Sequence, residues 1–149
     1  MRLKVLIREI ALFFLGPRWV DLDAKPYAIS NMAVKEHRRD GFYRFRNKKV
    51  SLFISEKQKG GGVGGPELMQ ELADKPVLNA NLLDHLLDHS RFIPNTWKGK
   101  YIYFWGTIYE SPNGVLWVRY LYWEYGKWFC SWQPFTQDFY AVNEILIAA

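Results

Sequence analysis

The stretch YIYFWGTIYESPNGVLWVRYLYWEYGKWFCSWQ, residues 101–133, decides the fold of this chain. Two runs rich in aromatic and β-branched residues, which favour strands, flank the string SPNG at residues 111–114. Proline and glycine at the second and fourth positions of that string are typical of a turn. A second turn at Tyr125-Gly126 precedes a third run of the same kind. We therefore predict a three-stranded antiparallel meander, whose register at residues 110–115 stays open because two loop lengths differ by one position.

Two short helices are predicted before the meander. Pro66 stands at a position favoured in the first turn of a helix, and residues 67–73 continue that helix. A second helix runs to about His89, with Asn79 or Asn81 as its N-cap and its leucines gathered on one face. An apolar face of this kind is expected to cover the sheet.

Glycine dominates residues 59–65, just before these helices. A segment so rich in glycine is either flexible or tightly turned. Gly60, Gly62 and Gly65 also match the spacing of a dinucleotide-binding loop. No clear second parallel strand with a ribose-binding acid follows. We therefore interpret residues 59–65 as a flexible loop within a single domain that spans residues 1–149.

A hairpin is predicted before the glycine-rich segment. Apolar residues occupy odd positions at Tyr43 and Phe45 but even positions at Val50 and Leu52. One straight strand cannot change phase in this way, because its side chains alternate between two faces. A two-residue turn at residues 47–48 restores a common apolar face, with Phe45 opposite Val50.

Positive charge is concentrated in residues 35–49, where seven basic residues accompany two acidic ones. That local excess equals the net charge of the whole chain, +5. Cations that alternate with aromatic rings suit nucleic acid, because the cations contact phosphates while the rings stack on bases. The other interpretation is that the rings fill the core below a solvated basic face. The residues expected to contact nucleic acid are Arg38, Arg39, Arg44, Arg46, Lys48 and Lys49.

The N-terminal residues 1–15 are predicted to form an amphipathic helix that ends at Gly16-Pro17. Its apolar run is far shorter than the ~20 residues that a membrane span requires. We expect this helix to pack on the core, since its polar face carries too few charges for a membrane-surface anchor, and we expect no membrane association. The apolar residues that recur at helical spacing are Leu3, Leu6, Ile7, Ile10 and Phe14.

No motif in the sequence defines a reaction. His85 and His89 are four residues apart, a spacing that suits two metal ligands, but they belong to the polar face of their predicted helix. Cys130 is the only cysteine, which excludes an internal disulfide and favours a reducing, cytoplasmic location. The sequence places no activating histidine next to Cys130. We therefore expect a non-enzymatic protein without a bound metal or cofactor.

Four strings in the last half to two thirds of the chain are specific enough to compare with known families. They are VLNANLLD at residues 77–84, IPxxWKGK at 93–100, FWGTIY at 104–109 and VRYL at 118–121. On these strings the chain resembles an uncharacterised family of small bacterial proteins. The resemblance implies a single domain that contains the aromatic sheet, and it implies no activity.

The sequence as a whole predicts an α+β fold. An antiparallel aromatic-rich sheet, made of the N-terminal hairpin and the C-terminal meander, is expected to pack with two or three short helices. The predicted function is a binding module with nucleic acid as the partner of the basic hairpin. The alternative is a protein-interaction or assembly module that uses rings on one face of the sheet. The rings that would serve this alternative are Trp105, Trp117, Tyr120 and Trp123.

Overall fold

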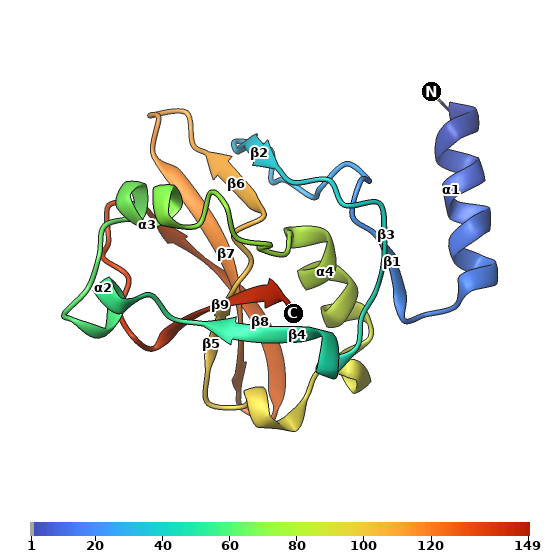
Figure 1. Cartoon of the computed structure of the whole chain (residues 1–149). Coiled ribbons are helices and arrows are strands. Elements are labelled where there is room, and N and C mark those ends of the chain that lie inside the picture. The colour runs from blue at the N-terminus through green and yellow to red at the C-terminus, as the bar shows by residue number, and fades with distance from the viewer. Residues whose placement is uncertain (1) are drawn as a thin grey trace.

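The computed structural model describes residues 2–149, so Met1, the first residue of the predicted N-terminal helix, lies outside the described part. The fold is α+β, with helices on both faces of a seven-stranded mixed sheet (Figure 1). The α-helices are α1 (Arg2–Leu15), α2 (Glu56–Lys59), α3 (Gly65–Glu71) and α4 (Ala80–Asp88), and the 3-10 helices are η1 (Asn47–Lys49), η2 (Ser90–Phe92) and η3 (Asn95–Trp97). The strands are β1 (Trp19–Asp21), β2 (Ala33–His37), β3 (Phe42–Arg44), β4 (Val50–Phe53), β5 (Tyr101–Tyr103), β6 (Thr107–Glu110), β7 (Leu116–Glu124), β8 (Lys127–Pro134) and β9 (Asn143–Ala148).

The strands of the predicted meander are found inside this larger sheet. Strand β7 pairs antiparallel with β8 on one side, and on the other side with both β5 and β6. The first predicted strand is therefore divided in two by residues 104–106. The backbone N–H of Ser111 donates a 2.9 Å hydrogen bond to the carbonyl of Val115. Gly114 has the positive φ, +83°, that such a three-residue loop requires, and this loop sets the register that the sequence left open.

Segments distant in sequence extend the meander. Strand β9 pairs parallel with β5 and antiparallel with β4, and β2 pairs antiparallel with β6. The order across the sheet is β2-β6-β7-β5-β9-β4, with β8 joined to β7. The prediction of a purely antiparallel sheet is thus wrong at the β5–β9 pair, because a C-terminal strand enters between strands that precede it in sequence.

The predicted hairpin that turns at residues 47–48 is also wrong. Residues Asn47–Lys49 form η1, and the strands on either side of it pair with different partners. Strand β3 joins β1 in a separate two-stranded ribbon, whereas β4 joins β9 in the main sheet, so Phe45 and Val50 do not face each other. Lys48 is a poor residue for the positive φ of a two-residue turn, and the apolar β9 is available as a partner for β4.

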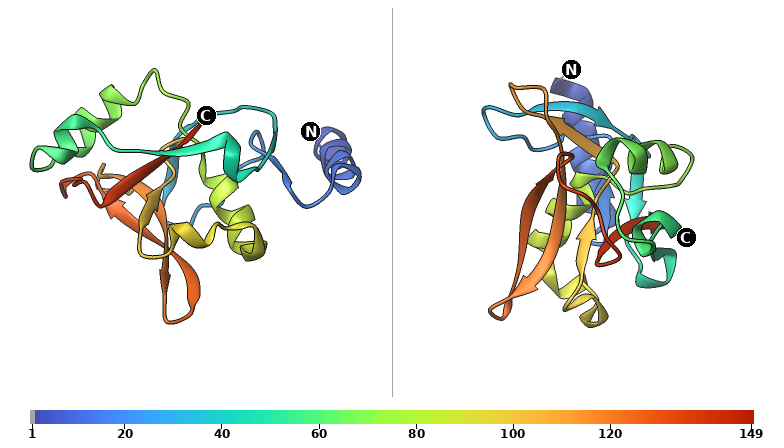
Figure 2. Two further views of the ribbon diagram at one scale, coloured as in Figure 1. Left: turned by 60° about the horizontal axis from the view of Figure 1, so that its bottom comes forward. Right: turned by 90° about the vertical axis from the view of Figure 1, so that its left-hand side faces the viewer.

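The core consists of two clusters, one on each face of the sheet. On one face, α4 buries Leu82, Leu83 and Leu86 completely, as its predicted leucine face requires. On the other face, Leu68 of α3 and its C-cap Leu72 pack against the aromatic side chains of the meander. Helices therefore cover a part of both faces, as the views in Figure 2 show.

The glycine-rich segment makes close contacts. Val63 forms an isolated β-bridge with Phe139. Gly65 lies so near Phe135 that a Cβ atom on Gly65 would be 2.4 Å from the ring. The interpretation of residues 59–65 as a flexible loop does not account for these contacts.

Helix α1 forms where it is expected, but it does not pack on the core. None of its residues is buried, and Phe13 and Phe14 are 83% and 80% exposed. The expectation of a core helix is wrong, because an amphipathic pattern identifies an apolar face without identifying what covers it. Within residues 2–149, no helix has the length and apolar character needed to cross a membrane.

Candidate nucleic-acid interface

Four of the six cations predicted to contact nucleic acid project from one exposed segment. Arg44 ends β3, Arg46 follows it, and Lys48 and Lys49 belong to η1. All four residues are exposed. Among residues 2–149, no carboxylate lies within ion-pair distance of any of them. We call these four residues the basic segment.

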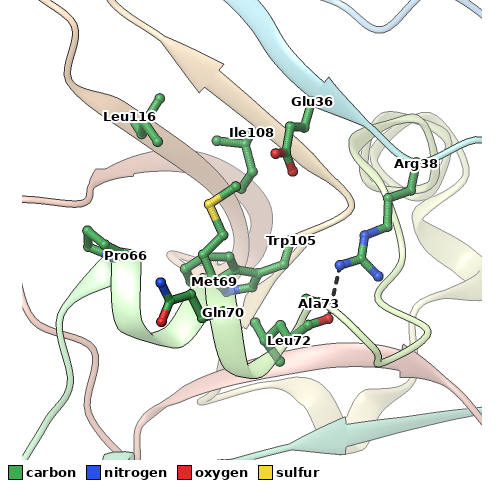
Figure 3. A pocket seen from close by; sticks show the side chains of 10 residues that line it. All are labelled: Glu36, Arg38, Pro66, Met69, Gln70, Leu72, Ala73, Trp105, Ile108 and Leu116. Atoms are coloured by element: carbon green, nitrogen blue, oxygen red, sulfur yellow. Dashed lines mark hydrogen bonds between the residues drawn. The ribbon is translucent and has the colours of Figure 1, made fainter.

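The other two predicted cations, Arg38 and Arg39, interact with groups of the protein itself. Arg38 donates hydrogen bonds to the carbonyl oxygens of Leu72 (2.9 Å, Figure 3) and Lys75 (2.5 Å), and so holds the chain at the end of α3. Arg39 has a guanidinium nitrogen 3.8 Å from a carboxylate oxygen of Asp23. The structure therefore does not bring Arg38 and Arg39 into the basic segment.

The rings between the basic residues face the core. Phe45 is buried and packs edge-on against Trp97, with ring centroids 6.1 Å apart. Tyr43 is half-buried, its hydroxyl donates to the carbonyl of Lys49 at 3.4 Å, and burial raises its pKa. Alternation along the chain then directs Arg44 and Arg46 outward. These rings anchor the segment and are not free to stack on bases.

A second cationic region contains the rings that the basic segment lacks. The β7–β8 turn and the chain after α4 enclose a groove of about 580 Å³. Trp123 and Trp128 pack edge to face in its wall, with centroids 5.2 Å apart. The Nζ of Lys98 lies 4.0 Å from the Trp123 ring centroid, and Arg91 and Lys127 also line the groove. We call these five residues the tryptophan groove.

Contacts between buried rings link the basic segment to the tryptophan groove. Phe45, which lies between Arg44 and Arg46, packs on Trp97, and Trp97 directly precedes the groove residue Lys98. Phe92 directly follows the groove residue Arg91. The guanidinium groups of Arg91 and Arg18 lie 4.5 and 4.3 Å from the ring centroid of Phe92. The carbonyl of Arg18 in turn accepts a 2.8 Å hydrogen bond from the Phe45 N–H.

The basic segment, the cations of the tryptophan groove and Arg18 share one electrostatic property: they have no ion-pair partner in the described part of the chain. None of them forms an ion pair within residues 2–149, so their charge is available to an external anion. Most other basic side chains of the protein are paired or hydrogen-bonded to its own carbonyls. The surface consists of Arg18, Arg44, Arg46, Lys48, Lys49, Arg91, Lys98 and Lys127.

Sequence reasoning found the basic segment and missed most of the groove. Arg91, Lys98 and Lys127 come from separate stretches that are not unusually charged. The available signal was the hairpin turn between Trp123 and Trp128, which predicts two facing rings. Its link to the basic segment depends on tertiary packing, which the sequence pattern does not reveal.

The four rings of the alternative interface do not share one surface. Trp105 is buried below α3, where its indole N–H has no acceptor among residues 2–149, and it lines a pocket of about 710 Å³ that Figure 3 shows. Trp117 and Tyr120 are three residues apart on β7 and so point to opposite faces. Trp123 belongs to the tryptophan groove. These four residues therefore do not form one binding face.

A different set of rings lies uncovered on the sheet. Tyr120 packs on Tyr101 and Tyr122, with centroids 6.0 and 5.7 Å apart, and Phe129 stacks on Tyr122 at 5.7 Å. Tyr101 and Phe129 are exposed. We call these four residues the tyrosine strip.

A buried ion pair joins α4 to the sheet. Arg119 is 3% exposed and donates two hydrogen bonds, of 3.0 and 2.8 Å, to the carboxylate of Asp84. The same guanidinium lies 3.4 Å from Sγ of Cys130. The cysteine is thus part of a structural network and stands beside an arginine rather than a histidine.

His37, the last residue of β2, lies between β6 and the start of α4. Its Nε2 donates to the carbonyl of Leu22, and its Nδ1 is hydrogen-bonded to the hydroxyl of Thr107, both at 2.9 Å. That hydroxyl oxygen also accepts the N–H of Ala80 at 2.9 Å. Burial lowers the pKa of His37.

The other two histidines are engaged with the backbone. Their rings stack with centroids 4.3 Å apart, the Nε2 of His85 contacts the carbonyl of Pro17 at 2.5 Å, and the Nδ1 of His89 contacts the carbonyl of His85 at 3.0 Å. Burial lowers the pKa of His85. In the described part of the chain, no three His, Cys, Asp or Glu side chains gather so that they could hold a metal ion.

Comparisons with models of protein families, with curated proteins and with solved structures find no match for this chain. The resemblance to a family of small bacterial proteins therefore stays a prediction. The function has to be argued from the geometry alone.

Proposed function

We propose that this protein is a non-enzymatic module that binds single-stranded nucleic acid. The phosphates lie along the basic segment, and the bases lie against the tryptophan groove. One observation carries this proposal, namely that three cations line a groove with two half-buried tryptophans, and that the packing of Phe45 on Trp97 links this groove to the four exposed cations of the basic segment, none of these seven cations having a carboxylate partner within residues 2–149. Lysine and arginine contact phosphates in any sequence, and tryptophan stacks on any base, so we expect little sequence preference.

The tryptophans are the reason for proposing a single strand. A base must be unpaired and turned out of its stack before its face can meet a protein ring. Duplex DNA offers its phosphates to the basic segment but hides its base faces from Trp123 and Trp128. We therefore expect the protein to bind a single strand more tightly than a duplex of the same length.

Fluorescence anisotropy of a dye-labelled, mixed-sequence single strand tests the proposal at low salt. The double variant Arg44→Ala/Arg46→Ala should bind about tenfold more weakly or worse, since it loses two charge-assisted contacts. The matched control is Lys57→Ala/Lys59→Ala. It removes the same charge from exposed lysines of α2 that already pair with Glu67 and Glu56, and it should bind as the parent does.

Three results would contradict the proposal. The parent protein shows no binding at low salt, the two double variants weaken binding equally, or a duplex binds as tightly as the single strand. Equal weakening would assign the binding to net charge alone. A Trp128→Ala variant sharpens the assignment, because it should weaken binding of the single strand and leave binding of a duplex unchanged.

The alternative function is a protein-interaction module, and one observation supports it. The tyrosine strip combines stacked rings with exposure of Tyr101 and Phe129, and such rings are common at the centres of protein interfaces. A Tyr101→Ser/Phe129→Ser variant should bind nucleic acid normally. Loss of nucleic-acid binding in that variant would move the site to the tyrosine strip.

A further inference from the structure

The pocket in Figure 3 is separate from the candidate nucleic-acid interface. It lies between α3 and the strands β2 and β6, and its volume is about 710 Å³. That volume is within the range of ~300–1,000 Å³ that is usual for small-molecule sites. None of its lining residues belongs to the basic segment or to the tryptophan groove. A ligand of this pocket would therefore not compete directly with a nucleic-acid strand for the same side chains.

Two opposite charges line the pocket from one strand. Glu36 lies opposite Ile108, which also lines the pocket, and the backbone N–H of Arg38 continues the ladder with a 2.7 Å hydrogen bond to the carbonyl of Gly106. Residues i and i+2 of a strand share a face, and Figure 3 shows both side chains directed toward the pocket. Within residues 2–149, neither forms an ion pair with the other or with any other group. An anionic and a cationic group are therefore both available to a ligand.

Arg38 keeps hydrogen-bond donors for a ligand. Its two Nη atoms each donate one hydrogen bond, to the carbonyls of Leu72 and Lys75. A guanidinium has five N–H groups, so these two bonds leave donors unused. The carbonyl oxygens fix the position of the guanidinium without neutralising its charge. The group is thus already placed for an anion, which lowers the entropic cost of binding one.

The remaining lining is largely apolar and contains one unpartnered donor. Met69, Ile108 and Leu116 line the pocket together with Trp105, which is 3% exposed. The Nε1–H of Trp105 is buried and has no acceptor among residues 2–149. Buried donors are normally hydrogen-bonded, because a donor that loses water without gaining a partner is destabilising. This N–H indicates a ligand with an acceptor atom, and the apolar lining indicates a ligand with an apolar group.

A ligand with a single charge fits this lining poorly. A monocarboxylate is attracted by Arg38 but repelled by Glu36, and the reverse holds for an amine. An α-amino acid carries both charges on one carbon. Its ammonium nitrogen and a carboxylate oxygen are about 3 Å apart, and a charge-assisted hydrogen bond of about 2.8 Å on each side extends this span to about 8 Å. Residues i and i+2 of a strand are roughly 7 Å apart, so the two side chains match the two ends of the ligand.

We propose that the pocket binds a free α-amino acid with an apolar side chain. The ammonium group pairs with Glu36, and the carboxylate accepts hydrogen bonds from Arg38 and from the indole N–H of Trp105. The side chain of the ligand packs against Met69 and Ile108. This binding does not depend on the proposed nucleic-acid interface.

Three ligands that share a phenyl ring test which charges the pocket recognises. Phenylalanine carries both charges, phenylpropionate carries only the carboxylate, and phenethylamine carries only the ammonium group. Isothermal titration calorimetry should show that phenylalanine binds at least about tenfold more tightly than either of the others, because each of them lacks one charge-assisted contact. The proposal is overturned if a singly charged ligand binds as tightly as phenylalanine, or if phenylalanine, leucine and methionine all fail to bind at millimolar concentration.

Glu36→Gln removes the partner of the ammonium group without changing the size of the side chain. It should weaken phenylalanine binding about tenfold and should not weaken phenylpropionate binding, since it also removes a repulsion. Glu67→Gln is the matched control, because Glu67 is likewise exposed but pairs with Lys57 and does not line the pocket. This control should bind phenylalanine as the parent does. Equal weakening by the two variants would overturn the proposal.

Nuclear magnetic resonance of the indole N–H groups locates the ligand. The seven tryptophans supply seven such signals, and single Trp→Phe variants identify those of Trp105, Trp123 and Trp128. Phenylalanine should shift the Trp105 signal and leave the other two in place. It should also bind equally well to the parent and to Arg44→Ala/Arg46→Ala. A shift of the Trp123 or Trp128 signal without one of Trp105 would assign the ligand to the tryptophan groove and contradict the proposal.

Discussion

Helices α1 and α4 have similar amphipathic sequences and opposite environments. Helix α4 buries Leu82, Leu83 and Leu86 on the sheet. Helix α1 is longer and carries more apolar residues, yet it is attached to the protein through Arg8 and buries none of its side chains. Helical periodicity thus predicts an apolar face in both cases, but only tertiary packing decides whether the protein itself covers that face.

The largest expected effect tests this contrast directly. Leu86→Ala should reduce the free energy of unfolding by about 2–5 kcal/mol, because Leu86 is completely buried and the substitution leaves a cavity. Ile10→Ala, a comparable truncation on α1, should change it by no more than about 0.5 kcal/mol. Urea unfolding followed by tryptophan fluorescence measures both. Equal losses would mean that α1 packs on the core and that the contrast is wrong.

A smaller effect compares two adjacent glycines. Gly65→Ala should cost about 1–3 kcal/mol, because its new Cβ would lie 2.4 Å from the ring of Phe135. Gly64→Ser should be neutral or slightly stabilising, since a Cβ there is 3.9 Å from its nearest neighbour and serine is a good N-cap for α3. Thermal unfolding measures the pair. Tolerance of Gly65→Ala would favour the flexible loop that the sequence suggested.

These elements show why the sequence predicts some of the fold and not the rest. The β7–β8 hairpin, the β6–β7 turn and the N-cap of α4 by Asn79 depend on neighbouring residues, so local signals are sufficient. The partners of β3 and β4 are distant in sequence, and the alternation of apolar residues fits a local hairpin equally well. Long-range pairing therefore accounts for the wrong hairpin and for the mixed sheet.

The candidate site, too, has features that neighbouring residues determine and features that long-range packing determines. Exposure of Arg44 and Arg46 follows from their alternation with Phe45, so the sequence predicts it correctly. The hydrogen bonding of Arg38 to the carbonyls of Leu72 and Lys75, just after α3, is a tertiary contact. The link between the tryptophan groove and the basic segment is another, since it consists of the packing of Phe45 against Trp97.

The pH dependence of the free energy of unfolding tests the burial of His37 and His85 near α4, and its expected effect is smaller still. Burial lowers the pKa of His37 and His85 in the folded protein, whereas in the unfolded chain the imidazole pKa is about 6.5. The unfolded chain therefore takes up protons first as the pH falls below about 6.5, and the free energy of unfolding decreases. Above that pH the stability contribution is fully present.

Urea midpoints at about pH 7.5 and pH 5 measure this dependence. The His37→Gln variant should lose less stability between the two values than the parent, because glutamine does not titrate. A parent whose midpoint stays constant between these values, or a variant with the parent's full pH dependence, would show that burial does not lower the pKa of His37.

The salt dependence of oligonucleotide binding tests the central claim most directly, namely that unpaired exposed cations next to the tryptophan groove hold a nucleic-acid strand. Each phosphate contact to a single strand contributes about −0.7 to the slope of log affinity against log salt, so the four cations of the basic segment contribute a slope of about −3. Arg44→Ala/Arg46→Ala should make the slope shallower by about 1.4 and leave the melting temperature nearly unchanged, because both side chains are exposed. A variant with the parent's affinity and slope would contradict the account.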